Sequence, residues 1–275
     1  MAIYGLDAFS PAEVARRVSE VGVRKARLPF VPMAMLGVLG GAFIALGALY
    51  FTLITSDPAL GYSAKQVLGG VVFSLGLILV VVGGAELFTG NNLLVMAWAD
   101  RLISTRELLR NWLIVYTTNL IGAAGVAVLA WLARLGDGSG GAIANQAVAI
   151  AAAKVSLPFA QAFFEGVLCN VLVCLAVWLA MAGRSVTDKI LAIVFPISAF
   201  VAAGFEHSVA NFFFIIFGML VQADSTSGAA ALTWAGFVRN LVPVTLGNIV
   251  GGSVLVALVY HLIYRRQSEA PPEAD

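Results

Sequence analysis

Six long apolar runs dominate the sequence and constrain its fold more than any other feature. The runs cover approximately Pro32–Ile54, Val67–Ala97, Trp112–Leu132, Pro158–Met181, Ile190–Val221 and Leu241–Tyr264. A helix needs about 20 mostly apolar residues to cross the hydrocarbon core of a bilayer, and each run is that long. The sequence therefore predicts an all-α integral membrane protein with six transmembrane helices.

Composition excludes several other classes. Charged residues make up 11% of the 275 residues, whereas soluble domains carry about 25%. The formal net charge is +1, so no basic field exists to bind nucleic acid. Cys169 and Cys174 lie five apart in one apolar run, a spacing that fits neither a disulfide framework nor a zinc site. We expect a single membrane domain without metal or cofactor.

The chain divides into three predicted parts. Residues 1–31 read as a cytoplasmic amphipathic helix that begins after Ser10-Pro11, residues 32–266 as the six-span domain, and residues 267–275 as a disordered cytoplasmic tail. Twelve of the 16 Lys and Arg residues fall in the N-terminal segment, the loops after runs two and four, and the C-terminus. Because basic residues gather on the cytoplasmic side, both termini are expected in the cytoplasm, with the chain in the inner (plasma) membrane.

Runs two and five are interrupted by polar residues at mid-membrane depth. Run two contains the stretch 83–92 and run five the stretch 203–211, both rich in Gly, Asn and hydroxyl side chains that weaken a helix. Unwound backbone survives in a bilayer only when it is packed in protein or lines a cavity. A pair of interrupted spans at matching places in two halves is the best sequence indication of a transport site.

The two halves match in position. Glu86 and Glu206 are 120 residues apart, and each lies in the second span of a three-span half. Since an odd number of spans per half inserts the second half upside down, the sequence predicts inverted three-helix repeats. The broken helices two and five are then expected to meet near the membrane midplane.

Several side chains at the breaks are candidates for function. An ionisable group inside a membrane normally faces a pathway, so His207 is the main candidate. Glu86 and Glu206 are expected to accept hydrogen bonds from backbone N–H groups freed at the breaks, and Thr89 to belong to a mobile loop. Lys154 is either a solvated loop charge or a cation that attracts anions at a pore mouth.

Other residues keep open alternatives. Glu165 could lie at the lipid edge, contact a second subunit or bond another helix. The Gly37-x-x-x-Gly41 and Gly247-x-x-x-Gly251 faces predict close helix approach, within a subunit or between subunits. His261 is expected near the membrane surface.

These residues resemble the signature segments of the formate/nitrite transporter family. The segments that carry the resemblance are Gly204–Asn211, Glu86–Thr89, Phe73–Leu79, Leu168–Trp178, Gly183–Ser185 and Pro243–Asn248. The resemblance extends along nearly the whole chain. It implies aquaporin-like protomers, each with its own pore, assembled as a homopentamer.

The resemblance also implies roles for individual residues. His207 corresponds to the central pore histidine, Thr89 to the flexible loop, Asn170 to a hydrogen-bond partner at the centre, and Lys154 to the lysine near the periplasmic vestibule. Glu206 and Asn211 belong to the same substrate pathway. The expected constrictions are Phe73, Leu77 and Phe200 on the periplasmic side, and Leu87, Phe88 and Val173 on the cytoplasmic side.

The implied function is bidirectional, pH-dependent transport of small monovalent anions, with formate modestly favoured over nitrite or hydrosulfide. The sequence departs from formate channels after Thr89, where Gly90-Asn91-Asn92 follows, and at Glu165. Apolar constrictions would strip hydration from an anion, so Lys154 is expected to attract it. His207, with an unperturbed pKa of about 6.5, is expected to hydrogen-bond the anion or lend it a proton.

Three other functions are disfavoured by the sequence. With two histidines, no His-Glu-x-x-His and no Gly-x-Ser-x-Gly, the chain is not expected to be an enzyme. A neutral-solute channel of the aquaporin kind uses two Asn-Pro-Ala boxes, which the sequence lacks. A purely structural or signalling protein leaves Glu206-His207 at the midplane unexplained.

Overall fold

The computed structural model describes residues 8–226 and 231–265, and all regular structure within them is helical. The α-helices are α1 (Pro11–Ala26), α2 (Phe30–Thr55), α3 (Tyr62–Gly83), α4 (Val95–Ala99), α5 (Thr105–Leu132), α6 (Ala142–Ser156), α7 (Phe159–Ala182), α8 (Val186–Ala202), α9 (Ser208–Val221), α10 (Trp234–Ile249) and α11 (Val259–Arg265). Shorter 3-10 segments are η1 (Gly90–Leu94), η2 (Leu135–Gly141) and η3 (Gln222–Asp224), and the π-helical η4 (Val250–Leu258) joins α10 to α11. The tail predicted at residues 267–275 lies outside the described residues.

The six predicted crossings are confirmed. Four single helices, α2, α3, α5 and α7, are long and apolar enough to span a membrane, as is the continuous stretch Trp234–Tyr264. The sixth crossing is divided between α8 and α9, which are interrupted at residues 203–207. The chain is therefore a multi-pass membrane protein.

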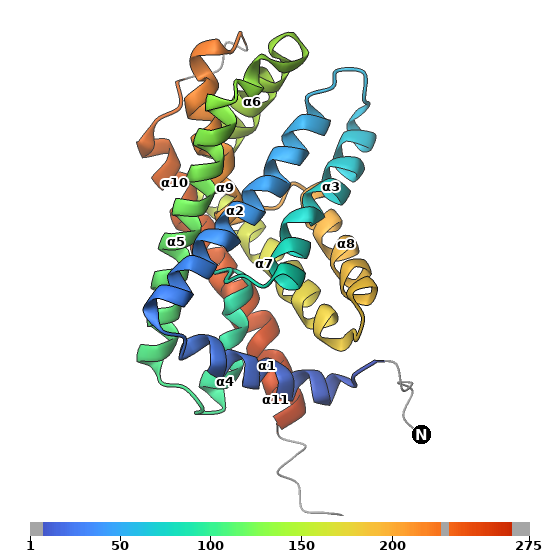
Figure 1. The fold of residues 1–275 in the computed structure, drawn as a ribbon, viewed down its shortest axis with the longest axis vertical. Helices are drawn as coiled ribbons and strands as arrows, with labels where there is room; N and C mark the ends of the chain where they lie inside the picture. Colours follow the sequence, from blue (N-terminus) through green and yellow to red (C-terminus); the bar gives the residue numbers. More distant parts are fainter. Residues whose placement is uncertain (1–7, 227–230, 266–275) are drawn as a thin grey trace, which may run out of the picture.

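The two halves of the chain, α1–α5 and α6–α11, form an inverted repeat. The equivalent helices α1 and α6 lie at opposite ends of the bundle, and α3 and α8 lie side by side where the halves meet (Figure 1). Tyr116 of α5 and Thr245 of α10 hold equivalent positions 129 residues apart, and their hydroxyl oxygens are 2.8 Å apart. The pseudo-two-fold axis therefore passes between these two side chains.

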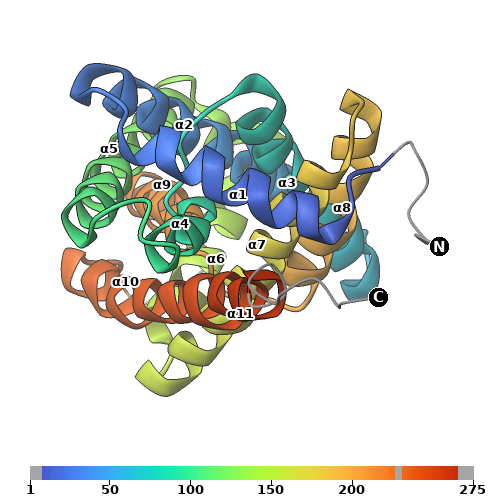
Figure 2. The same ribbon diagram turned by 90° about the horizontal axis from the view of Figure 1, so that it is seen from below.

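Helix α1 is amphipathic and packs on the protein. Ser10 and Glu13 form a capping box at its start, and the N–H and hydroxyl groups of Ser10 lower the pKa of the exposed Glu13 carboxyl. Val14 and Val18 are buried in a cluster with Leu94 of η1 and residues of α4 and α7. Figure 2 shows α1 lying across this end of the molecule, beside α4.

Each break follows a helix that ends at a left-handed glycine. Gly84 has φ +81° and Gly204 has φ +75°, a conformation that costs other residues energy because of their Cβ atom. The next N–H groups reach back in the same way: Ala85 donates to the Val80 carbonyl at 2.9 Å, and Phe205 to the Phe200 carbonyl at 3.0 Å. Two equivalent C-caps thus turn the chain out of α3 and α8.

The glycine faces predicted from the sequence pack within the protomer. A Cβ on Gly41 would collide with the backbone of Asn119 in α5, and one on Gly122 with the Val38 carbonyl in α2. In the second half, Gly247 and Gly251 lie equally close to the backbone of α7. Of the two alternatives left by the sequence, the structure supports contact within a subunit.

We expect Gly122→Ala to lower the free energy of unfolding by about 1–3 kcal/mol, because the added methyl group forces α2 and α5 apart. Gly125→Ala is the matched control, since a Cβ at Gly125 meets no atom within 4 Å. Thermal unfolding of the detergent-solubilised protein measures both. Equal transition temperatures for the two variants would contradict close packing at Gly122.

Candidate functional site

The two helix breaks meet at His207 and Thr89. The His207 Nε2 and Thr89 Oγ1 atoms are 2.9 Å apart, and both side chains are buried. His207 is also the N-cap of α9: its Nδ1 accepts a hydrogen bond from the Ala210 N–H at 3.0 Å. A neutral imidazole has one N–H, so the proton sits on Nε2 and is donated to Thr89. The backbone thereby fixes the tautomer.

Asn170 of α7 links the backbone at Thr89 to the backbone of α10 at Asn248. Its Nδ2 donates to the carbonyls of Thr89 at 3.3 Å and Asn248 at 2.7 Å, and the Cys174 thiol donates to the Thr89 carbonyl at 3.4 Å. Asn170 Oδ1 is buried and has no hydrogen-bond partner among the described residues. The structure thus brings together His207, Thr89 and Asn170, which the family resemblance places at the centre.

Lys154 and Glu206 form a buried ion pair on the α6 side of this centre. The Lys154 Nζ lies 2.6 Å from Glu206 Oε1, and the lysine side chain is 14% exposed. Glu206 Oε2 accepts from Asn211 Nδ2 at 2.7 Å and from Asn240 Nδ2 at 3.1 Å. Lys154 lies in the last turn of α6, so the solvated-loop alternative does not describe it.

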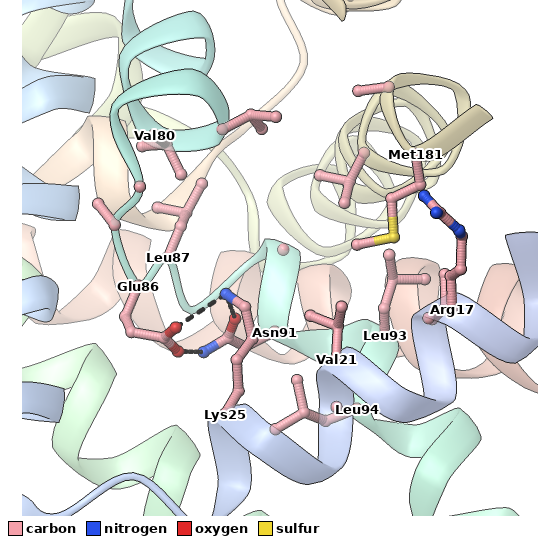
Figure 3. Close-up of a pocket in the computed structure, with 18 of the residues that line it drawn as sticks. Arg17, Val21, Lys25, Val80, Glu86, Leu87, Asn91, Leu93, Leu94 and Met181 are labelled. Carbon is pink, nitrogen blue, oxygen red and sulfur yellow. Dashed lines mark hydrogen bonds and ion pairs between the residues drawn. The ribbon is translucent and has the colours of Figure 1, made fainter. Parts of the chain in front are cut away.

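An equivalent cluster lies on the α1 side. The Lys25 Nζ is 2.9 Å from Glu86 Oε1, and Asn91 Nδ2 donates to Glu86 Oε2 at 2.6 Å and to Asn111 Oδ1 at 2.9 Å. Figure 3 shows Lys25, Glu86 and Asn91 pointing toward one another from α1, the break and η1. Each member matches one of the Lys154 cluster, so the repeat has placed one lysine–glutamate pair on each side.

The predicted role of the two glutamates is wrong in its partners. We expected Glu86 and Glu206 to accept from freed backbone N–H groups, but their carboxylates accept from lysine and asparagine side chains. Two of the freed N–H groups, one at each break, are bound instead by asparagines. Phe88 donates to Asn119 Oδ1 at 2.9 Å, and Ser208 donates to Asn248 Oδ1 at 3.0 Å.

Asn119 and Asn248 suit this position because an amide both accepts and donates. Asn119 Nδ2 donates to the carbonyls of Gly37 at 2.7 Å and Glu86 at 2.9 Å. Asn248 Nδ2 donates in the same way to the carbonyls of Gly166 at 2.8 Å and Glu206 at 3.0 Å. A carboxylate has no donor with which to satisfy these carbonyls.

An internal repeat in the sequence, with a spacing of 129 residues, marks the site residues that were not predicted above. The motif Lys-x-x-Leu-Pro-Phe occurs at Lys25–Phe30 and again at Lys154–Phe159. The pattern Arg-Asn followed eight residues later by Asn occurs at Arg110–Asn119 and again at Arg239–Asn248. A search for internal repeats would therefore have found Lys25, Asn111, Asn119, Asn240 and Asn248.

Two cavities approach the centre from opposite ends. The α1-side cavity, of about 670 Å³, is lined by Lys25, Glu86 and residues of α3, and the α6-side cavity, of about 430 Å³, by Lys154, Glu206 and His207. The two share no lining residue. Buried side chains separate the two cavities, so a solute would have to pass His207 and its buried neighbours to go from one cavity to the other.

The predicted constriction residues are all buried. Phe73 and Phe200 line the α6-side cavity with ring centroids 5.6 Å apart, and Phe200 stacks on His207 at 5.9 Å. Leu77, one helical turn along α3 from Phe73, lines the α1-side cavity with Leu87. Of the other two, Phe88 packs on Tyr116 at 4.8 Å, and neither it nor Val173 lines either cavity.

Two further polar residues have defined places. His261 Nδ1 lies 2.9 Å from Asp100 Oδ1 near α1, and Glu165 lines the α6-side cavity. Within residues 8–226 and 231–265, no group of three or more His, Cys, Asp or Glu side chains could hold a metal ion.

Comparisons with known proteins agree with this architecture. Residues 12–262 match the family described as formate/nitrite transporter. The chain is 41% identical to the uncharacterized transporter YrhG of Bacillus subtilis (96% of each chain covered) and 38% identical to the formate channel FocA of Escherichia coli K12 (96% and 97%). A solved structure described as a pentameric formate channel with formate bound superposes with a TM-score of 0.79 at 38% identity, covering 86% of this chain and 98% of the other.

We expect Asn248→Ala to destabilise the protein strongly. The change leaves the Ser208 N–H and two carbonyls unpaired in a buried region, at about 1–3 kcal/mol for each group. Asn119→Ala should cost a similar amount because its contacts are equivalent. The half-exposed Asn145 provides the control Asn145→Ala, where water can replace the lost bonds. Thermal unfolding in detergent measures all three, and Asn248→Ala unfolding like Asn145→Ala would refute the assignment.

Proposed function

Because the chain belongs to the formate/nitrite transporter family, we propose that it conducts small monovalent anions across the membrane, with formate the favoured substrate. The observation that carries the proposal is the position of His207. Its N–H donor has a fixed orientation and lies among the buried apolar side chains that separate two cavities, each lined by a lysine. Relatives named formate channel support the choice of formate. Nitrite and hydrosulfide are the alternatives, since both carry the same charge and are small.

Lys154 and Lys25 supply the electrostatic part of the proposal. Each is ion-paired to a glutamate, Lys25 also donates to Asn91 Oδ1 at 3.0 Å, and an ammonium group has three donors. The remaining donors can bind an anion at the inner end of each cavity. Low-dielectric walls strengthen this interaction. The anion then meets Phe73, Phe200, Leu77 or Leu87 and loses hydration, which is the main barrier to its passage.

His207 acts in this proposal as a hydrogen-bond donor through Nε2. The donor now bound to Thr89 can turn to a passing carboxylate without any change of protonation. Lending a proton to the anion requires a structural change as well. An imidazolium carries a proton on Nδ1, and in the structure that atom accepts the hydrogen bond from the Ala210 N–H. Proton-coupled transport through His207 therefore requires the N-cap bond of α9 to open.

The assembly and location are proposed on separate grounds. The solved structure described as a pentameric formate channel supports a homopentamer, which native mass spectrometry in mild detergent tests. The excess of Lys and Arg at the α1 end supports a cytoplasmic location for both termini and the α1-side cavity, with the protein in the inner (plasma) membrane. The α6-side cavity then opens to the outside.

The proposed function is tested by flux into proteoliposomes. We expect fast uptake of formate, slower uptake of nitrite and hydrosulfide, and no uptake of glycerol, because a neutral triol gains nothing from the lysines. Empty liposomes and liposomes that contain the Asn248→Ala variant are the controls. Passage of glycerol without any of the three anions would overturn the proposal.

The role of His207 is tested by two variants. Asn is a good N-cap and a donor, so we expect His207→Asn to keep α9 in place and to conduct formate. It does not titrate between about pH 5 and 8, so it should lose any proton movement coupled to formate. His207→Phe removes the donor and should lose the pH dependence of transport.

The measurement is simultaneous formate current and internal pH across that range of external pH. Wild-type proton coupling in His207→Asn would show that the proton takes another route.

A further inference from the structure

The two cavities carry opposite net charge. The charged residues that line the α1-side cavity are Arg17, Arg24, Lys25 and Lys189 with Glu20 and Glu86. The α6-side cavity is lined by one cation, Lys154, and two carboxylates, Glu165 and Glu206. Because His207 is neutral in its fixed tautomer, the α6-side lining is negative whereas the α1-side lining is positive. This difference is unexpected in an inverted repeat whose two lysine–glutamate pairs match.

Glu165 is the origin of the negative charge. Its equivalent in the first half, 129 residues earlier, is Leu36, which lines the α1-side cavity. If position 165 were also apolar, Lys154 and Glu206 would leave the α6-side cavity neutral, as Lys25 and Glu86 alone would on the other side. Comparison of the two halves thus identifies Glu165 as a charge that the first half lacks at the equivalent position.

The Glu165 carboxylate is placed to act on a solute. It projects from α7 into the α6-side cavity, is half-buried, and accepts a hydrogen bond from Gln161 Nε2 at 2.8 Å. The charged groups within electrostatic reach of it are Glu206 and Lys154. Arg239, on the neighbouring α10, does not line the cavity. Its hydrogen-bond partner Gln161 lies on the same helix, α7, and Glu165 itself forms part of the cavity wall.

We propose that Glu165 sets the apparent affinity of the α6-side entrance, where its charge opposes Lys154 and weakens the binding of free anions from that side. The inference rests on the proposed function and adds a direction to it. A lower bulk concentration of the anion is therefore sufficient to fill the centre from the α1 side than from the α6 side.

The size of the effect follows from electrostatics. A unit charge inside a narrow, low-dielectric funnel changes the local concentration of an anion by about three- to tenfold. The effect weakens with salt, because the Debye length falls from about 10 Å at 0.1 M to about 3 Å at 1 M. The saturated rate is set at the apolar closure, which Glu165 does not form, so Glu165 affects apparent affinity alone.

The experiment measures formate influx against formate concentration in proteoliposomes sorted by the exposed side of a C-terminal tag. We expect Glu165→Gln to lower the half-saturating concentration about three- to tenfold for influx from the α6 side, with the saturated rate unchanged. Influx from the α1 side stays the same. Asp137→Asn is the matched control: Asp137 lies in η2, near the same end of the molecule, but does not line the α6-side cavity.

Two further measurements do not depend on that variant. Leu36→Glu places a carboxylate at the equivalent position and should raise the half-saturating concentration from the α1 side. In the wild-type protein, added inert salt should lower the half-saturating concentration from the α6 side and raise it from the α1 side, because salt screens repulsion at one entrance and attraction at the other.

The outcomes separate the inference from the proposed function. Formate flux with no change from Glu165→Gln, an equal change from both sides, or an equal effect of Asp137→Asn overturns the role of Glu165 alone. The same salt response from both sides overturns it as well. Absence of any anion flux through the wild-type protein overturns the proposed function, and the inference with it.

Discussion

The structure depends on one constraint of the bilayer: backbone N–H and C=O groups must be paired even where a helix is broken. Two breaks bring His207 and Thr89 together, and each break exposes groups that water cannot reach. Asn119 and Asn248 each satisfy three such groups, one amide per break, by accepting from one N–H and donating to two carbonyls. The two amides hold the interrupted helices open, and the central histidine is positioned by that scaffold.

Much of the architecture could be predicted from apolar runs and polar interruptions alone. Those patterns act over a single span, so span number, both breaks and the candidacy of His207 and Thr89 followed from them. The contacts of Glu86 and Glu206 did not, because they join residues from helices distant in sequence, such as Lys154 and Asn240. The cavity that Leu77 lines was not predictable for a similar reason: one helical turn separates Leu77 from Phe73, which lines the other cavity.

For the proposed function, the charge distribution reconciles an apolar closure with the passage of an anion. Each lysine is partly buried beside a fully buried glutamate, so the pair adds no net charge, yet it leaves ammonium donors beside the cavity. A lone buried ammonium would be costly, and the paired form avoids most of that cost. Under the role proposed for Glu165, affinity on each side is adjusted by residues that surround the pair and can vary without disturbing the scaffold.

The contact between Tyr116 and Thr245 has an evolutionary consequence. Equivalent positions that touch across a two-fold axis are the signature of an isologous interface, the kind formed by two identical subunits. A chain with a single half, inserted in both orientations, could form such an interface with its own copy. After fusion of two copies into one chain, each half can change in sequence independently of the other. His207 opposite Leu87, and Glu165 opposite Leu36, are changes that a symmetric ancestor could not have made on one side alone.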